Sequence, residues 1–199
     1  MKRWVARAAL AAALMTPWPA FAHLVNSGLG PFYDGALHLL LSPGDLLGLV
    51  AVALLAGLRG PRAGRLTVIV LPLAWLLAGL LGLRTSMPLD LTWLSTLSFV
   101  SLGLLVALDA RIAPWVVALL AGGYATLQGV QNGATLAAIG AGAVSLFGIV
   151  LAVLMIALLT AAAVVPLRVL WSRTLVRVAG SWIVAVGMLM LGWTLKGVT

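Results

Sequence analysis

Residues 37–58 read LHLLLSPGDLLGLVAVALLAGL, a stretch that is apolar except at His38 and at Ser42-Pro43-Gly44-Asp45. A run of roughly 20 apolar residues can cross a bilayer as one helix. Proline removes a backbone donor and glycine loosens the chain, so we expect a broken or re-entrant entry into the membrane at this point. Because ionisable groups are costly inside a membrane span, the break at Asp45 is a candidate functional site.

The rest of the chain has the same apolar character. Of its 199 residues, 63% are hydrophobic and 8% are charged, against about a quarter charged in ordinary soluble domains. We therefore predict an all-α integral membrane protein, a six-helix transmembrane bundle over residues 23–199 with no soluble domain. Hydropathy places the six spans near residues 37–58, 66–83, 91–108, 113–130, 136–165 and 175–195, with an uncharged turn at Gln131-Asn132-Gly133 between the fourth and the fifth.

Residues 1–22 have the features of a cleavable signal peptide. Lys2, Arg3 and Arg7 precede a short apolar run, two prolines follow it, and Ala20-Phe21-Ala22 supplies small residues for a signal peptidase. The apolar run is too short for a membrane span, which is the alternative interpretation. Cleavage here leaves His23 as the first residue of the mature chain, with a free amine beside its imidazole.

The basic residues predict an orientation. Seven arginines fall in the loops on one side of the predicted bundle: Arg59, Arg62, Arg65, Arg111, Arg168, Arg173 and Arg177. By the positive-inside rule this side faces the cytoplasm, so both ends of the mature chain face outward from a bacterial-type inner membrane. The net charge of +8 is thus explained by topology, and we expect no nucleic-acid binding.

Polar residues that could bind a ligand gather near the first span. We predict a metal site formed by His23, Asp34, His38 and Asp45, since imidazole, amine and carboxylate groups suit nickel, cobalt, copper or zinc. Gln128 in the fourth span could line a polar path. Other interpretations remain open: His23 as an exposed terminus, His38 hydrogen-bonded to Asp34, and Asp45 as the N-cap of a helix.

The residues that are missing exclude several kinds of chemistry. The chain has no cysteine and no glutamate, which rules out disulfides, thiolate metal sites and iron–sulfur clusters. Ser42, His38 and Asp45 are the residue types of a catalytic triad, but no nucleophile elbow accompanies them, and there is no phosphate-binding loop. We therefore expect neither an enzyme nor a required cofactor, apart from a divalent metal bound at the predicted site.

The first span resembles the HupE/UreJ family of small membrane proteins associated with hydrogenase and urease. That family has a signal peptide, about six spans and a Gly-x-x-His-Pro…Asp-His signature, and Gly35, His38 and Asp45 match it here. Leu46 replaces the second histidine, and the proline lies at position 43. The fourth span, where the family tends to carry two His-Gly pairs, has no histidine and reads AGGYATLQG over residues 121–129.

The resemblance implies a nickel or cobalt permease, or a protein that captures such a metal on the periplasmic side. Fewer imidazoles imply a lower affinity for nickel or a different selectivity, because carboxylate and amide oxygens suit harder ions. The expected partners are the lipid bilayer, a divalent metal ion and a second membrane protein or another copy of the chain. The alternative function is a non-transporting accessory subunit of a larger membrane complex.

Overall fold

The computed structural model describes residues 27–85, 91–167 and 169–196. The predicted signal peptide, its cleavage site and His23 lie outside these residues. The described chain is all-α, as predicted, and contains no strand. Its seven helices are α2 (Pro31–Leu41), α3 (Pro43–Leu58), α4 (Pro61–Gly82), α5 (Thr92–Ala107), α6 (Pro114–Ala138), α7 (Ala143–Val164) and α8 (Leu170–Leu195).

The predicted break in the first apolar segment is present. Helices α2 and α3 meet at Ser42, where their axes are bent by 75°. Ser42 is extended, and Pro43 occupies the first position of α3, where a helix needs no backbone donor. Pro31 and Pro61 likewise begin their helices, each after a glycine with a positive φ that lets the chain turn.

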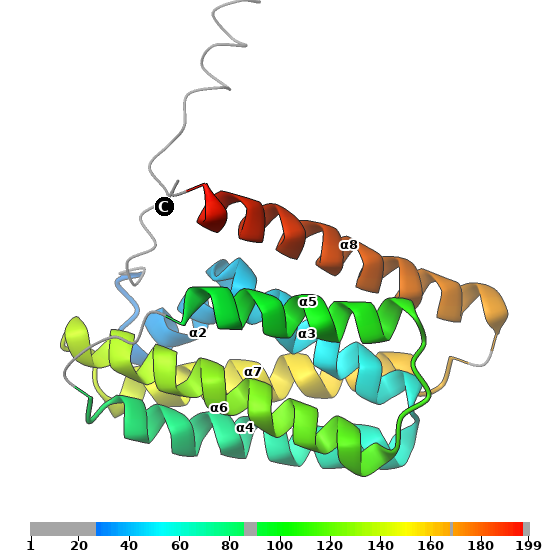
Figure 1. Cartoon of the computed structure of the whole chain (residues 1–199). Helices are drawn as coiled ribbons and strands as arrows, with labels where there is room; N and C mark the ends of the chain where they lie inside the picture. Colours follow the sequence, from blue (N-terminus) through cyan, green and yellow to red (C-terminus); the bar gives the residue numbers. More distant parts are fainter. Residues whose placement is uncertain (1–26, 86–90, 168, 197–199) are drawn as a thin grey trace, which may run out of the picture.

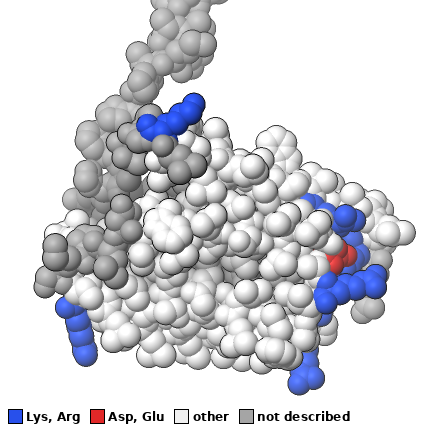
Figure 2. Space-filling view, viewed as in Figure 1, with Lys and Arg blue, Asp and Glu red and all other residues white. Residues whose placement is uncertain are grey.

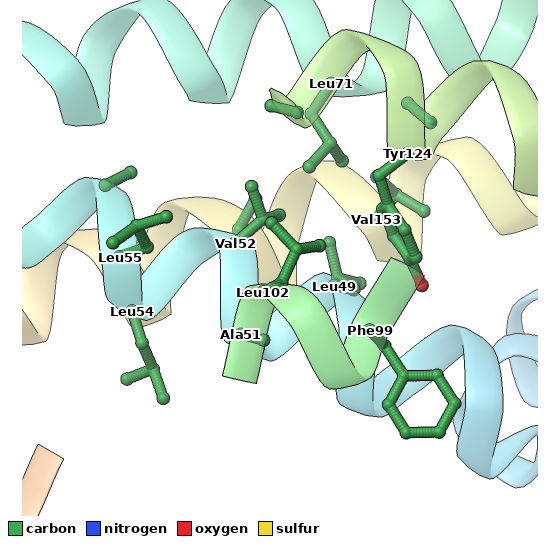
Figure 3. Packing of buried hydrophobic residues seen from close by; sticks show 14 of the residues in the cluster. Leu49, Ala51, Val52, Leu54, Leu55, Leu71, Phe99, Leu102, Tyr124 and Val153 are labelled. Atoms are coloured by element: carbon green, nitrogen blue, oxygen red, sulfur yellow. The ribbon is translucent and has the colours of Figure 1, made fainter. Parts of the chain in front are cut away.

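Helix α3 forms the centre of the bundle (Figure 1). Every residue from Ala51 to Leu58 is buried, and the helix packs against α4, α5, α6, α7 and α8. Leu71, Phe99 and Val153, from three of these helices, surround it in the core (Figure 3). Helix α3 begins at the break and runs into the centre of the bundle. Asp45, in its first turn, therefore lies between the surrounding helices.

The outer surface is apolar. Large side chains such as Leu77, Leu119, Leu159 and Trp182 are more than half exposed, as expected for a surface that meets lipid. In the described residues, α4, α7 and α8 are long and apolar enough to cross a membrane, and the bent α2–α3 pair makes a fourth candidate. Helix α5 is apolar but short, and the long helix α6 is not among these candidates, so six crossings remain a prediction.

One sequence prediction about the helix boundaries is wrong. Gln131-Asn132-Gly133 was expected to form a turn, but α6 continues through these residues to Ala138. The turn lies further on, at Gly140, whose φ of 71° suits glycine. The expected fifth span at 136–165 is consequently divided, and α7 begins only at Ala143. The physical reason is that the buried Asn132 has hydrogen-bond partners inside the bundle, which outweigh its preference for turns.

Glycines let α2 lie directly against α7. A Cβ atom added at Gly35 would lie 2.0 Å from the carbonyl oxygen of Ser145, and one added at Gly148 would lie 1.9 Å from that of Phe32. Close backbone contact through small residues is a common way of packing helices in membranes. This contact holds α2, and with it His38, beside the break.

Most of the charged side chains visible in Figure 2 gather at one end of the bundle, where α3 and α5 end and α4, α6 and α8 begin. The carboxylate of Asp109 accepts hydrogen bonds from Arg59 and from Arg173, the latter at 2.8 and 2.9 Å. The Arg59 side chain is only 9% exposed. These ion pairs tie the end of α3 and the start of α8 to the α5–α6 loop.

Replacing Asp109 with asparagine should therefore destabilise the fold. Asparagine tolerates the positive φ of 48° at this position, so the change removes the charge and preserves the backbone. Losing charged hydrogen bonds to a nearly buried arginine should cost about 2 kcal/mol, measured as a lower thermal unfolding temperature in detergent. Arg62→Gln, at an exposed arginine of the same end, is the control. An unchanged unfolding temperature for D109N would show that the ion pairs contribute nothing.

Candidate functional site

Asp45 lies in the first turn of α3, but it does not cap the helix. The N-cap is Ser42, which contradicts the N-cap interpretation of Asp45. A carboxylate in the first turn is favoured by the helix dipole. Both oxygens of the Asp45 carboxylate face α6, where their hydrogen-bond donors lie.

Two amide side chains of α6 bind the Asp45 carboxylate. Nε2 of Gln128 donates to Oδ1 at 2.9 Å, and Nδ2 of Asn132 donates to Oδ2 at 3.0 Å. The two donors are four residues apart and so lie on the same face of α6. Both are nearly fully buried, with 1% and 4% of their surface exposed. Each carboxylate oxygen thus has a fixed donor.

Further hydrogen bonds hold this arrangement in place. Oγ of Ser95 in α5 donates to Oε1 of Gln128 at 2.8 Å, and Nε2 of Gln131 donates to the same oxygen at 3.1 Å. The hydroxyl of Tyr124 donates to the backbone carbonyl of Asp45 at 2.7 Å. The network connects α3, α5 and α6 at the break.

The Tyr124 hydrogen bond can be tested directly. Tyr124→Phe keeps the ring, which packs against Gly48 and edge-on against Trp75, and removes only the hydroxyl. We expect a loss of about 1 kcal/mol in the free energy of unfolding, seen as a lower unfolding temperature. Tyr33→Phe, at an exposed tyrosine, is the matched control. If both variants unfold at the wild-type temperature, the hydroxyl does not anchor α3.

A polar cavity of about 200 Å³ lies beside this network. Residues from α2, α3, α5, α6 and α8 line it, among them His38, Asp45, Ser95, Gln128, Asn132 and Thr135. A water molecule takes up about 30 Å³ of liquid, so the cavity has room for an ion with part of its hydration shell. Carboxylate, amide, hydroxyl and imidazole groups converge on it.

The structure separates the predicted metal ligands. His38 and Asp45 both line the cavity, and the imidazole lies next to the side chain of Asn132. Asp34 does not line it, because its carboxylate accepts hydrogen bonds from the backbone and the hydroxyl of Ser27, at 2.7 and 2.5 Å. No three His or Asp side chains in the described residues are close enough to bind a metal together. A ligand role for His23 stays a prediction.

Gln128, the residue that the sequence suggested for a polar path, lines the cavity. Asn132, Ser95 and Tyr124 also belong to the network but were not predicted as site residues. The signal that could have identified Asn132 is its spacing of four from Gln128. Two buried amides on one helical face need partners, and Asp45 is an acid in an apolar stretch.

The glycines that follow these amides have a separate role. A Cβ atom at Gly129 would lie 2.5 Å from the carbonyl oxygen of Trp75, and one at Gly133 would lie 2.1 Å from that of Gly79. Successive residues of a helix point about 100° apart. One face of α6 therefore packs closely on α4 while the adjacent face presents the amides to Asp45.

Comparison with protein families identifies the relatives of this chain. The model of the HupE / UreJ protein family matches residues 10–190, which include the site and all or most of every described helix. The chain belongs to the HupE/UreJ family. This family is associated with nickel and cobalt uptake for the maturation of hydrogenase and urease. No curated protein and no solved structure matches the chain.

Membership of the HupE/UreJ family supports the interpretation of this chain as a membrane protein that handles metal ions. Within the HupE/UreJ signature, Gly35 contacts α7, and His38 and Asp45 line the cavity. The matching residues therefore surround the break or hold it in position. The site of this HupE/UreJ protein is centred on a carboxylate and two amides.

Proposed function

We propose that this HupE/UreJ protein is a permease of the inner membrane that moves a divalent transition metal into the cell. The observation that carries the proposal is the polar cavity at the helix break, where α6 amides hold Asp45 beside His38. A carboxylate among apolar helices is expensive unless it serves a pathway or a ligand. No catalytic role is proposed for these residues.

The fold supports a direction of transport. In the described residues, the arginines of the predicted cytoplasmic side lie at the bundle end opposite the α2–α3 break (Figure 2), whereas Arg84 follows the end of α4 and Lys196 the end of α8. By the positive-inside rule the break then lies near the periplasmic side. An inward membrane potential favours entry of a cation by about 2.3 kcal/mol per charge per 100 mV. We propose that the ion exchanges water for oxygen and nitrogen ligands at the cavity before it crosses.

Transport by the purified protein tests this proposal. The full chain is reconstituted in vesicles, and the entry of nickel, cobalt and manganese ions is followed with and without an inside-negative potential. A permease gives saturable entry that the potential accelerates. An accessory subunit gives no entry above that of protein-free vesicles and copurifies with a stable membrane partner, a result that would overturn the proposal.

A further inference from the structure

The cavity that we propose as the metal site offers mainly oxygen ligands, and the inference below rests on that proposed function. Among the polar lining residues that the structure describes, only His38 supplies an imidazole. The others supply a carboxylate, amides and hydroxyls, with Met190 as a thioether at the wall. Carboxylate, carbonyl and water oxygens suit magnesium and manganese, whereas imidazole-rich sites suit nickel, copper and zinc.

Asn132 presents a buried side-chain oxygen that no hydrogen bond of good geometry reaches in the described residues, and the His38 imidazole lies beside it. Its Nδ2 donates both to Asp45 and to the backbone carbonyl of Gln128, at 3.0 and 2.9 Å. A flipped amide would lose both bonds, so the partners fix which atom is the oxygen. Oδ1 then accepts no hydrogen bond of good geometry, although Asn132 is only 4% exposed and lines the cavity. A buried acceptor of this kind is costly unless a ligand satisfies it.

The Asp45 carboxylate retains capacity for a cation. Its two oxygens have about four acceptor positions, and the side-chain amides of α6 use one on each oxygen. No lysine or arginine lines the cavity in the part of the chain that the structure describes. The carboxylate therefore lies at the cavity with no lysine or arginine beside it in the described residues. Its single negative charge is available to a bound cation.

Helix α6 repeats the same pair of residue types. Gln128-Gly129 and Asn132-Gly133 repeat one pattern on α6, a side chain toward Asp45 followed by a glycine against α4. The amides on this face of α6 offer oxygen ligands and hydrogen-bond donors to the cavity, and no nitrogen ligand.

We infer that the cavity binds a hard, oxygen-ligated divalent transition metal of the manganese class and does not select for nickel. Asp45 and Asn132 Oδ1 supply the oxygen ligands, His38 the single imidazole, and Gln128 orients the carboxylate. Water completes the coordination sphere in the remaining volume of the cavity.

Competitive entry into vesicles tests the inference on the full chain. Entry of manganese and of nickel is measured for each ion alone and for the two together, and the ratio of their transport efficiencies is taken. We expect manganese to enter and to compete with nickel, with a nickel preference below tenfold. In the double variant Gln128→His/Asn132→His, added imidazoles should raise the nickel preference at least tenfold. Thr126→His, on an exposed position of α6 away from the cavity, should leave the ratio unchanged.

The outcomes separate this inference from the proposed function. Wild-type entry of nickel with a preference of tenfold or more over manganese overturns the inference and leaves the permease intact. If none of the ions enters the vesicles, both the inference and the proposed permease function are overturned. The ratio of nickel to manganese transport efficiency in the wild type is enough to decide. The inference can therefore be tested even if the double variant fails to fold.

Discussion

Asp45→Asn is expected to reduce metal entry to the level of empty vesicles while the protein still folds. The cavity would lose its carboxylate, and at an effective dielectric constant of 20 two unit charges 4 Å apart interact by about 4 kcal/mol. For a divalent ion this corresponds to a loss of at least ~100-fold in transport efficiency. Asparagine has nearly the same shape, and its side-chain oxygen can still accept a hydrogen bond from an α6 amide.

Asp34→Asn is the matched control for this experiment. It removes the other described acid near the break, which is bound to Ser27 and does not line the cavity. We expect Asp34→Asn to transport at the wild-type rate, with both variants eluting as the wild type does in size-exclusion chromatography. Transport by Asp45→Asn at more than a tenth of the wild-type rate would contradict a metal site at Asp45.

Gly133→Ala is expected to cause the largest loss of stability. Its Cβ atom would lie 2.1 Å from the carbonyl oxygen of Gly79 and 2.9 Å from the backbone nitrogen of Leu83. Both contacts are with backbone atoms, so α4 and α6 must move apart. Overpacking of this kind should cost about 3 kcal/mol, more than the gain of up to ~1 kcal/mol from replacing a helical glycine with alanine. The same movement displaces Asn132, so metal entry should fall as well.

Gly123→Ala is the control on the same helix. A Cβ atom there meets nothing within 4 Å, so only the propensity gain applies and the protein should unfold at the wild-type temperature or slightly above it. Thermal unfolding in detergent compares the two variants. If Gly133→Ala is as stable as Gly123→Ala, α4 and α6 do not make the close backbone contact at Gly133 described above.

The sequence predicts the helical class and the break because both depend on local chemistry. Apolar runs identify most of the helices, and Pro43-Gly44 interrupts the first run. The false turn at Gln131-Asn132-Gly133 shows where local rules fail. These polar residues are typical of turns, but the partner of Asn132 lies 87 positions away in the sequence.

The candidate site was predictable in part for the same reason. His38 and Asp45 are conspicuous because each is a polar residue in an apolar segment. Asp34 looked equivalent in the sequence, and only its bonds to Ser27 show that it serves the local backbone. The pairing of Asp109 with Arg59 and Arg173 joins residues 50 and 64 positions apart. Such contacts depend on how helices assemble, which hydropathy does not encode.

Anomalous diffraction can show whether a divalent ion binds between Asp45 and Asn132. Crystals of the full chain are equilibrated with millimolar manganese or, separately, nickel, and data are collected at the absorption edge of each metal. We expect an anomalous peak in the cavity within bonding distance of the Asp45 carboxylate and Asn132 Oδ1. A peak elsewhere, or none at this position in a preparation that transports the ion, would contradict metal binding between these two residues.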